Sequence, residues 1–117
     1  MSDVQIYHNP RCSKSRETLA LLEDRGIKPQ VIRYLDTPPD AETLKALVKQ
    51  LGFRSARQLI RHKEDEYLSA GLDNPALSEE QLLAAMVARP KLIERPIVVA
   101  NGQARIGRPP EQVLEIL

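Results

Sequence analysis

The sequence has a single cysteine, Cys12, and no tryptophan, with only one phenylalanine and three tyrosines. One thiol excludes an intrachain disulfide, and together with two histidines it leaves too few ligands for a zinc site. The scarcity of aromatic rings argues against a surface that stacks nucleic-acid bases, and a net charge of +1 provides no broad basic footprint. No run approaches the roughly 20 apolar residues needed to cross a bilayer. We therefore expect no metal, no nucleic-acid partner and no membrane partner.

The remaining composition is that of a globular protein, with 42% hydrophobic and 28% charged residues in 117 positions. This length predicts one domain over residues 1–117 with a real core. The first residues lack the basic and apolar regions of a secretory signal, and an unpaired thiol fits a reducing compartment, so we expect a cytoplasmic protein. Arginines outnumber lysines among the 17 basic residues. Arginine is the better side chain for bidentate binding of oxyanions.

The N-terminal part of the chain predicts a strand, a helix and a second strand. Residues Val4 to His8 alternate in polarity and contain β-forming side chains. Ser13 to Asp24 has an apolar stripe at helical spacing, and Gly26 follows as a stop signal. Gln30 to Leu35 is the second strand. Because a helix connects them, the two strands are predicted to be parallel.

The middle of the chain predicts four short helices separated by glycine and proline signals. These helices are expected over residues 41–51, 54–60, 64–70 and 81–89. Thr37 or Asp40 is the expected cap of the first helix. Ser78 to Gln81 resembles a capping box for the last one.

The C-terminal part predicts a hairpin and a final helix. Strands are expected over Pro96–Ala100 and Gln103–Ile106, joined by the strong turn signal Asn101-Gly102. Pro109-Pro110 then opens a helix over Glu111–Leu117. The order of all these elements predicts an α/β fold: a thioredoxin-like, mixed four-stranded sheet with a helical insertion.

Cys12 is predicted to lie between the first strand and the first helix. At a helix N-terminus it faces unpaired backbone N–H groups and the positive end of the helix dipole, which favour the nucleophilic thiolate. Arg11, Lys14 and Arg16 add positive charge nearby. Pro96 occupies the position at which a cis-proline faces the reactive cysteine in this fold, although cis X–Pro bonds are uncommon. The alternative is an inert, buried thiol.

Five motifs along the chain carry a resemblance to a known family. They are Tyr7-His8-Asn9-Pro10-x-Cys12-x-x-Ser15-Arg16, Tyr34-Leu35-x-x-Pro38-Pro39, Leu59-Ile60-Arg61, Arg95-Pro96-Ile97-Val98-Val99 and Gly107-Arg108-Pro109. In order and spacing they resemble the glutathione/glutaredoxin-linked arsenate reductases, over essentially the whole chain.

The resemblance implies roles for three residues around the thiol. Cys12 matches the nucleophile that attacks arsenate and forms a covalent arsenic–sulfur adduct. His8 matches a residue that tunes the ionisation of this cysteine, and a protonated imidazole would lower the Cys12 pKa. Ser15 lies one turn after Cys12, where its hydroxyl could reach the sulfur.

The resemblance also implies an oxyanion site and a set of partners. Arg61, Arg95 and Arg108 match three arginines that hold arsenate, and Arg105 is an alternative to Arg108 by alternation along its strand. No cofactor is expected to stay bound. Glutathione is the implied co-substrate, glutaredoxin is the implied protein partner, and arsenite is the product.

Two other functions stay open at this point. One is a related glutathione-dependent thiol reductase with a different substrate, because well-studied family members carry a longer C-terminal tail than this chain, which ends at Leu117. The other is a redox regulatory binding module. Modules of that kind often sense redox state through a Cys-x-x-Cys pair, whereas here the second position is Ser15.

Overall fold

The computed structural model describes residues 4–62 and 64–117. The chain forms two compact units, one made of the segment up to Thr37 together with Arg95–Leu117, the other of Pro38–Glu94. We call them the sheet unit and the helical unit. The single domain predicted for residues 1–117 stays a prediction.

The sheet unit contains a mixed four-stranded sheet. Its strands are β1 (Gln5–Tyr7), β2 (Gln30–Ile32), β3 (Ile97–Ala100) and β4 (Gln103–Ile106). Their order across the sheet is β2-β1-β3-β4, with β1 and β2 parallel and the other pairs antiparallel. This confirms the predicted fold class and the predicted β-α-β unit, whose helix is α1 (Ser13–Asp24).

The turn between β3 and β4 sets the register of the hairpin. Asn101 and Gly102 both have positive φ, 54° and 74°, as a two-residue type I′ turn requires. This turn pairs Ala100 with Gln103 and, at the far end, Ile97 with Ile106. Beyond this pair the Gly107 N–H donates to the carbonyl of Pro96 at 2.9 Å, so the contact between the two chain segments continues toward Arg95 and Arg108.

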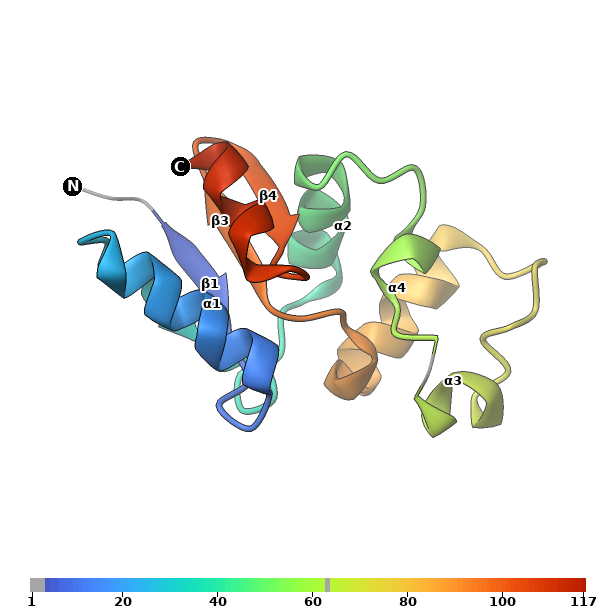
Figure 1. Ribbon diagram of the computed structural model, residues 1–117. Coiled ribbons are helices and arrows are strands. Elements are labelled where there is room, and N and C mark those ends of the chain that lie inside the picture. The colour runs from blue at the N-terminus through green and yellow to red at the C-terminus, as the bar shows by residue number, and fades with distance from the viewer. Residues whose placement is uncertain (1–3, 63) are drawn as a thin grey trace. The chain divides into compact units, whose positions relative to one another are not determined.

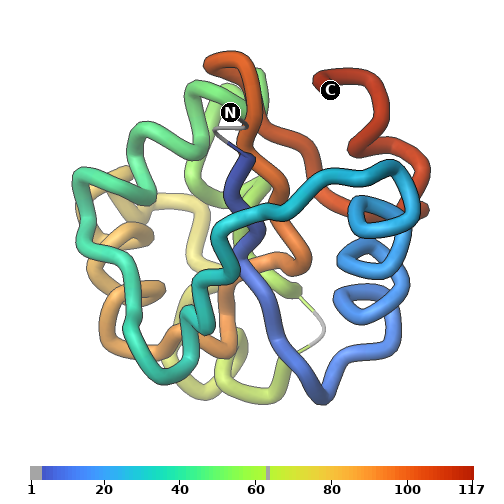
Figure 2. Tube along the Cα trace, turned by 90° about the vertical axis from the view of Figure 1, so that its left-hand side faces the viewer, coloured from blue at the N-terminus to red at the C-terminus, as the bar shows by residue number. Residues whose placement is uncertain are grey.

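One face of the sheet is covered by α1 and by a C-terminal 3₁₀ helix, η3 (Pro110–Ile116). The two helices lie side by side in Figures 1 and 2. Leu22 of α1 and Val113 of η3 are fully buried against Ile6 and Val98 of the sheet. This packing holds the C-terminal half of α1, the helix that begins after Cys12, against the sheet.

The described residues of the helical unit form a series of short helices. They are α2 (Ala41–Gln50), η1 (Ala56–Leu59), α3 (Asp65–Ser69), α4 (Glu79–Ala88) and η2 (Pro90–Leu92), drawn from green to orange in Figure 1. Asp40 caps α2 by accepting the N–H of Thr43 at 2.8 Å. Ser78 and Gln81 form the predicted capping box at the start of α4. An isolated antiparallel bridge joins Ile60 to Ile93.

Several predicted boundaries were wrong, and local hydrogen bonds explain why. The second strand ends at Ile32, because the N–H groups of Asp36 and Thr37 both donate to the carbonyl of Arg33 and begin a turn there. The helix predicted over 54–60 and the terminal helix are both 3₁₀. The short helix η2 (Pro90–Leu92) follows α4 directly, and it lies outside the helices predicted for the middle of the chain.

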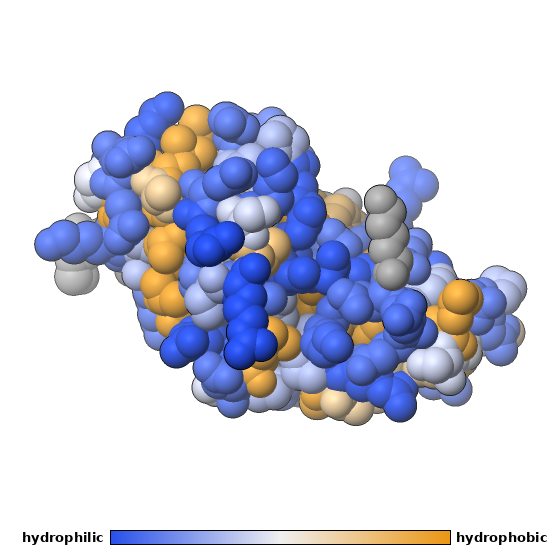
Figure 3. Space-filling view, turned by 60° about the horizontal axis from the view of Figure 1, so that its bottom comes forward, coloured by the Kyte–Doolittle hydropathy of each residue, from blue (hydrophilic) through white to orange (hydrophobic). Residues whose placement is uncertain are grey.

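Hydrophilic side chains dominate the face shown in Figure 3, and apolar residues appear there as narrow patches between them. Among the helices of residues 4–62 and 64–117, none combines the length and the apolar character that spanning a membrane requires.

Candidate active site

Cys12 is the N-cap residue of α1 and is only 9% exposed. The loop before it is held by Asn9, whose carbonyl accepts the Cys12 N–H and whose side chain accepts the Arg11 N–H, each at 3.0 Å. The Cys12 side chain makes no capping hydrogen bond, and the first turn of α1 contains no acidic residue. The helix therefore begins with unneutralised positive character directly at the sulfur.

The open end of the β3–β4 hairpin brings two arginines to this sulfur. The Arg108 Nε donates to the carbonyl of Arg95 at 2.8 Å, and Arg108 Nη2 lies 3.6 Å from Cys12 Sγ. The peptide bonds Arg95–Pro96 and Arg108–Pro109 are both cis. Within residues 4–62 and 64–117, neither arginine is ion-paired with a carboxylate, and the buried Nε of Arg95 has no hydrogen-bond partner. Both guanidinium groups can therefore receive an anion.

These surroundings change the acidity of the Cys12 thiol. Burial of the sulfur, the largest single influence, acts to raise its pKa. The backbone N–H groups of Ser15 and Lys14 and the charges of Arg95 and Arg108 act in the opposite direction. Together they outweigh burial, so that the pKa of Cys12 is lowered and the thiolate is favoured.

His8 and Ser15 form a buried pair beside this loop. His8 Nδ1 lies 2.7 Å from Ser15 Oγ, and Ser15 Oγ also accepts the Asn9 N–H at 3.0 Å. Burial, and after it the charge of Arg33, lowers the pKa of His8, so its imidazole is neutral at pH 7. The direction of the hydrogen bond between Ser15 Oγ and His8 Nδ1 follows the tautomer of the imidazole. The Ser15 hydroxyl thus faces His8 and Asn9, whereas its backbone N–H faces the sulfur.

Arg61, the third predicted oxyanion ligand, belongs to the helical unit. There its Nη1 donates to Glu64 Oε1, and its Nε lies 3.9 Å from Glu94 Oε1. The side chain is 20% exposed. Arg61 is therefore neutralised by two carboxylates, unlike Arg95 and Arg108, and its part in the Cys12 site stays a prediction.

Arg105, the alternative to Arg108, is engaged elsewhere. Its Nε donates to Glu115 Oε1 at 2.9 Å, and its Nη1 donates to the carbonyl of Ala104. It lies opposite Val98 within the hairpin, one position before the last pair, Ile97 and Ile106. The geometry therefore brings Arg108, and not Arg105, to the sulfur.

Sequence reasoning missed one contact that shapes the site. Gly107, between β4 and Arg108, lies so close to α1 that an ideal Cβ built on it would be 2.4 Å from Thr18 Oγ1 and 2.8 Å from Pro96 Cγ. Thr18 is fully buried, and its hydroxyl donates to the carbonyl of Lys14 at 2.8 Å. In the sequence, the signal for this contact is the glycine directly before Arg108. Gly107 does not have a positive φ, so the glycine is needed for the close approach and not for the backbone conformation.

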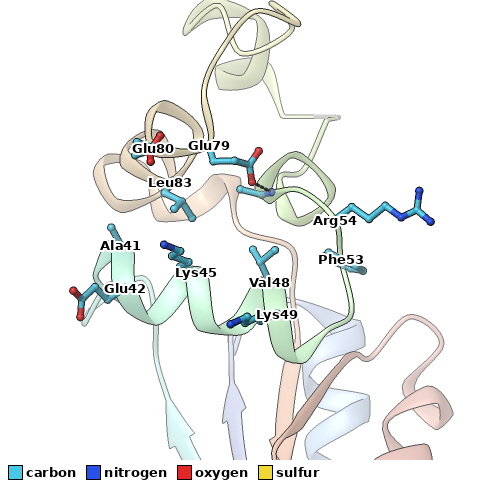
Figure 4. A pocket seen from close by; sticks show the side chains of 11 residues that line it. Ala41, Glu42, Lys45, Val48, Lys49, Phe53, Arg54, Glu79, Glu80 and Leu83 are labelled. Carbon is cyan, nitrogen blue, oxygen red and sulfur yellow. Dashed lines mark hydrogen bonds between the residues drawn. The ribbon is translucent and has the colours of Figure 1, made fainter.

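The helical unit has a cavity of its own, of about 370 Å³, between α2, the 53–56 segment and α4 (Figure 4). Val48 and Leu83 point into it from the two helices, and Arg54 points away. Glu79 borders it and accepts the Ala56 N–H at 2.7 Å. The residues that line it include none of the predicted site residues. Across the part of the chain that the structure describes, no group of three His, Cys, Asp or Glu side chains could hold a metal ion.

The lowered pKa of Cys12 leads to a first prediction. Alkylation by iodoacetamide follows the thiolate fraction, so its rate should rise with pH to a midpoint below the usual range of a free thiol. Arg95→Gln removes a positive charge, and the midpoint should move to higher pH. Alkylation rates measured by stopped flow or mass spectrometry between pH 5 and 10 give the midpoint for each protein. Arg105→Gln is the matched control and should leave the curve unchanged, and identical midpoints for all three proteins would contradict the assignment.

Comparison with known proteins gives a consistent result. The model of the ArsC family matches residues 7–116. A protein named arsenate reductase from Neisseria meningitidis is 53% identical over 117 residues, covering all of both chains. YfgD of Escherichia coli is 66% identical, with 97% of this chain and 96% of that protein covered. The solved structure of an arsenate reductase from Vibrio cholerae superposes with a TM-score of 0.97 at 63% identity, covering 99% of this chain and 98% of that one. The chain therefore belongs to the ArsC family.

Proposed function

We propose that this protein reduces arsenate to arsenite, with the Cys12 thiolate as nucleophile and glutathione as the source of electrons. The observation that carries the proposal is the position of the sulfur, at an uncapped helix N-terminus and 3.6 Å from the Arg108 guanidinium. Relatives that bear the name arsenate reductase support the same substrate.

Arsenate is a tetrahedral oxyanion, and the groups around Cys12 suit it. Arg95 and Arg108 offer forked N–H donors without competing carboxylates, and the first turn of α1 adds backbone N–H groups. These donors stabilise charge on the arsenate oxygens as the sulfur approaches arsenic, and no metal is needed for this. The same positive groups hold Cys12 in its thiolate form, so that one cluster binds the substrate and activates the nucleophile.

The proposed reaction proceeds in three steps. The Cys12 thiolate attacks arsenic and displaces one arsenate hydroxyl group, which takes up a proton from solvent and leaves as water, so that a sulfur–arsenic(V) bond remains. A glutathione thiolate then attacks the Cys12 sulfur; the sulfur–arsenic bond breaks, its electron pair stays on arsenic, and arsenite leaves. A second thiol, supplied through glutaredoxin, reduces the Cys12–glutathione disulfide. In total, two thiols become one disulfide and arsenic(V) becomes arsenic(III).

The other predicted residues receive more limited roles. We assign His8 to positioning: as a neutral imidazole it is hydrogen-bonded to the Ser15 hydroxyl, which in turn holds Asn9 and the loop before Cys12. Arg61 is proposed as the third oxyanion ligand, and recruiting it requires arsenate to compete with Glu64 and Glu94 for its guanidinium.

The test is an NADPH-coupled assay with arsenate, glutathione, glutathione reductase and glutaredoxin. Turnover should require all four, and omitting glutaredoxin should leave the enzyme trapped as a Cys12–glutathione disulfide, seen by mass spectrometry. Absence of arsenate turnover in a folded protein with a reactive Cys12 would contradict the substrate and favour the thiol reductase with a different substrate.

Loss of one arginine should weaken oxyanion binding without abolishing the chemistry. Arg108→Ala removes a charge-assisted contact, and we expect kcat/KM for arsenate to fall about ten- to thirty-fold. Arg108→Lys keeps the charge but loses the forked pair of N–H donors. Its kcat/KM should therefore lie between that of Arg108→Ala and that of the wild type. Steady-state kinetics measure this, with Arg105→Ala, on the same strand, as the control. Equal losses for Arg105→Ala and Arg108→Ala would contradict the site.

A further inference from the structure

The Cys12 site combines a thiolate with two guanidinium groups that no carboxylate of the described residues neutralises. Arg108 Nη2 lies 3.6 Å from Cys12 Sγ, and the charges of Arg95 and Arg108 both act on the thiol. All three residues belong to the sheet unit. An anionic group that binds these arginines therefore lies beside the attacking sulfur.

The orientation of Arg108 leaves donors available for such a group. Its Nε is committed to the carbonyl of Arg95 at 2.8 Å, and its Nη2 faces the sulfur. Within residues 4–62 and 64–117 the third nitrogen, Nη1, makes no hydrogen bond, and the buried Nε of Arg95 has no partner either. Unpaired charged donors next to a thiolate favour a ligand whose oxygens share a negative charge.

One class of organic molecule uses the thiolate and the arginines at the same time. In an organic S-sulfonate, R–S–SO₃⁻, a divalent sulfur is bonded directly to an anionic sulfonate group. A thiolate attacks divalent sulfur when the departing group can take the electron pair. The sulfur–sulfur bond is only about 2 Å long, so a sulfonate bound to the arginines presents the divalent sulfur to Cys12. We propose that the Cys12 site also cleaves organic S-sulfonates, with Arg95 and Arg108 binding the sulfonate and stabilising sulfite as it leaves.

The reaction requires glutathione as its only reductant. The Cys12 thiolate attacks the divalent sulfur and forms a Cys12–S–S–R disulfide, while the sulfur–sulfur bond of the substrate breaks and its electron pair leaves with sulfite. A glutathione thiolate then attacks the Cys12 sulfur and releases R–S⁻, which takes up a proton, and a second glutathione reduces the Cys12–glutathione disulfide. In total, one S-sulfonate and two glutathione thiols give one thiol, sulfite and oxidised glutathione. The inference rests on the proposed function for the anion-binding arginines and for glutathione.

Three thiol reagents test the first step without arsenate or glutathione. Ethyl thiosulfate and ethyl methanethiosulfonate transfer the same ethylthio group to Cys12, but the first is an anion that loses sulfite and the second is neutral and loses methanesulfinate. The third reagent, 2-sulfonatoethyl methanethiosulfonate, carries its negative charge on the transferred arm. Mass spectrometry of Cys12 gives each rate. The ratio of two rates in one protein cancels its thiolate fraction, because both reagents react with the same thiolate.

For the wild type, we expect the ratio of the ethyl thiosulfate rate to the ethyl methanethiosulfonate rate to exceed that of free 2-mercaptoethanol by about ten-fold or more. Arg108→Ala should lower this ratio about ten-fold, as for the loss of a charge-assisted contact, and Arg108→Lys should lower it less. Arg105→Ala, on the same hairpin, is the matched control and should leave the ratio unchanged. The 2-sulfonatoethyl reagent, compared with ethyl methanethiosulfonate, should change by about two-fold or less in Arg108→Ala, because its charge is not on the departing group.

Two results would overturn the proposal. One is a wild-type ratio equal to that of 2-mercaptoethanol. The other is an equal loss of reactivity toward both anionic reagents in Arg108→Ala, which identifies a general attraction of anions. Arg108→Lys keeps the charge, so its lower ratio tests the site even if Arg108→Ala does not fold. Cleavage of the S-sulfonate without arsenate turnover would support this inference and contradict only the arsenate substrate, whereas arsenate turnover with the ratio of 2-mercaptoethanol would overturn this inference alone.

Discussion

Replacing Cys12 with serine should abolish arsenate reduction while leaving the protein folded. A serine hydroxyl is not ionised at neutral pH, and the N–H groups and arginines that lower the pKa of the thiol cannot bring a hydroxyl into that range. Without a thiolate, neither the sulfur–arsenic bond nor the mixed disulfide can form. We expect a loss of roughly three orders of magnitude or more, as is usual for removal of a catalytic nucleophile. The coupled assay measures it.

The folding stability of Cys12→Ser should not fall with its activity. Cys12 is the N-cap of α1 but makes no capping hydrogen bond. Serine is among the preferred N-cap residues, and a cap of this kind is worth about 0.5–2 kcal/mol. In urea unfolding at a pH where the Cys12 thiol is protonated, Cys12→Ser should therefore be as stable as the wild type or slightly more stable. At higher pH the wild type also gains stability from its thiolate, because the folded protein lowers the Cys12 pKa.

This pair of results separates chemistry from folding. Loss of turnover with retained stability identifies Cys12 as the nucleophile, with Cys12→Ala as a second variant that lacks the cap. Arsenate turnover that persists in Cys12→Ser would contradict the mechanism. The proposed role of Cys12 explains why a residue that caps poorly occupies this helix N-terminus, because reactivity would be selected there at the expense of helix stability.

The central part of the site could be predicted because short-range signals determine it. The Asn101-Gly102 turn fixes the hairpin register as far as Ile97 and Ile106, and Arg95 and Arg108 follow at the open end of the same hairpin. The proline after the first strand and the helical stripe that follows place Cys12 at a helix start. These features depend on turn chemistry and hydrophobic spacing, which a single sequence contains.

Other features could not be predicted, because they depend on which side chains meet in space. Tyr34 is buried and continues the alternation of the second strand, yet it lies in the turn that begins at Arg33. Nothing in the local sequence indicates that Ser15 would bond to His8, or that Glu64 and Glu94 would neutralise Arg61. Sequence motifs identify these residues, but tertiary packing determines which side chains they contact.

Because Gly107 lies against Thr18, replacing this glycine should have the second large effect on stability and turnover. Gly107→Ala places a Cβ 2.4 Å from Thr18 Oγ1 and 2.8 Å from Pro96 Cγ, and both neighbours are buried. Overpacking of this kind typically costs 1–3 kcal/mol, about the loss we expect in urea unfolding. To relieve it, the segment that carries Arg108 must move away from α1. A shift near 1 Å can reduce a rate by about 100-fold, so arsenate turnover should fall by this order.

Two measurements distinguish displacement of Arg108 from a general loss of stability. If Arg108 moves away from Cys12, its charge acts less on the sulfur, and the midpoint of Cys12 alkylation should rise in Gly107→Ala at temperatures where the variant is fully folded. Thr18→Ala removes the nearest atom, Oγ1, together with Cγ2, and leaves Pro96 Cγ in place, so the double variant should be more stable than the sum of the single effects predicts. Additive effects with an unchanged midpoint would contradict the contact. Gly107 is thus required for close approach and not for backbone conformation: a side chain at this position would separate the hairpin from the helix whose N-terminus holds the thiolate.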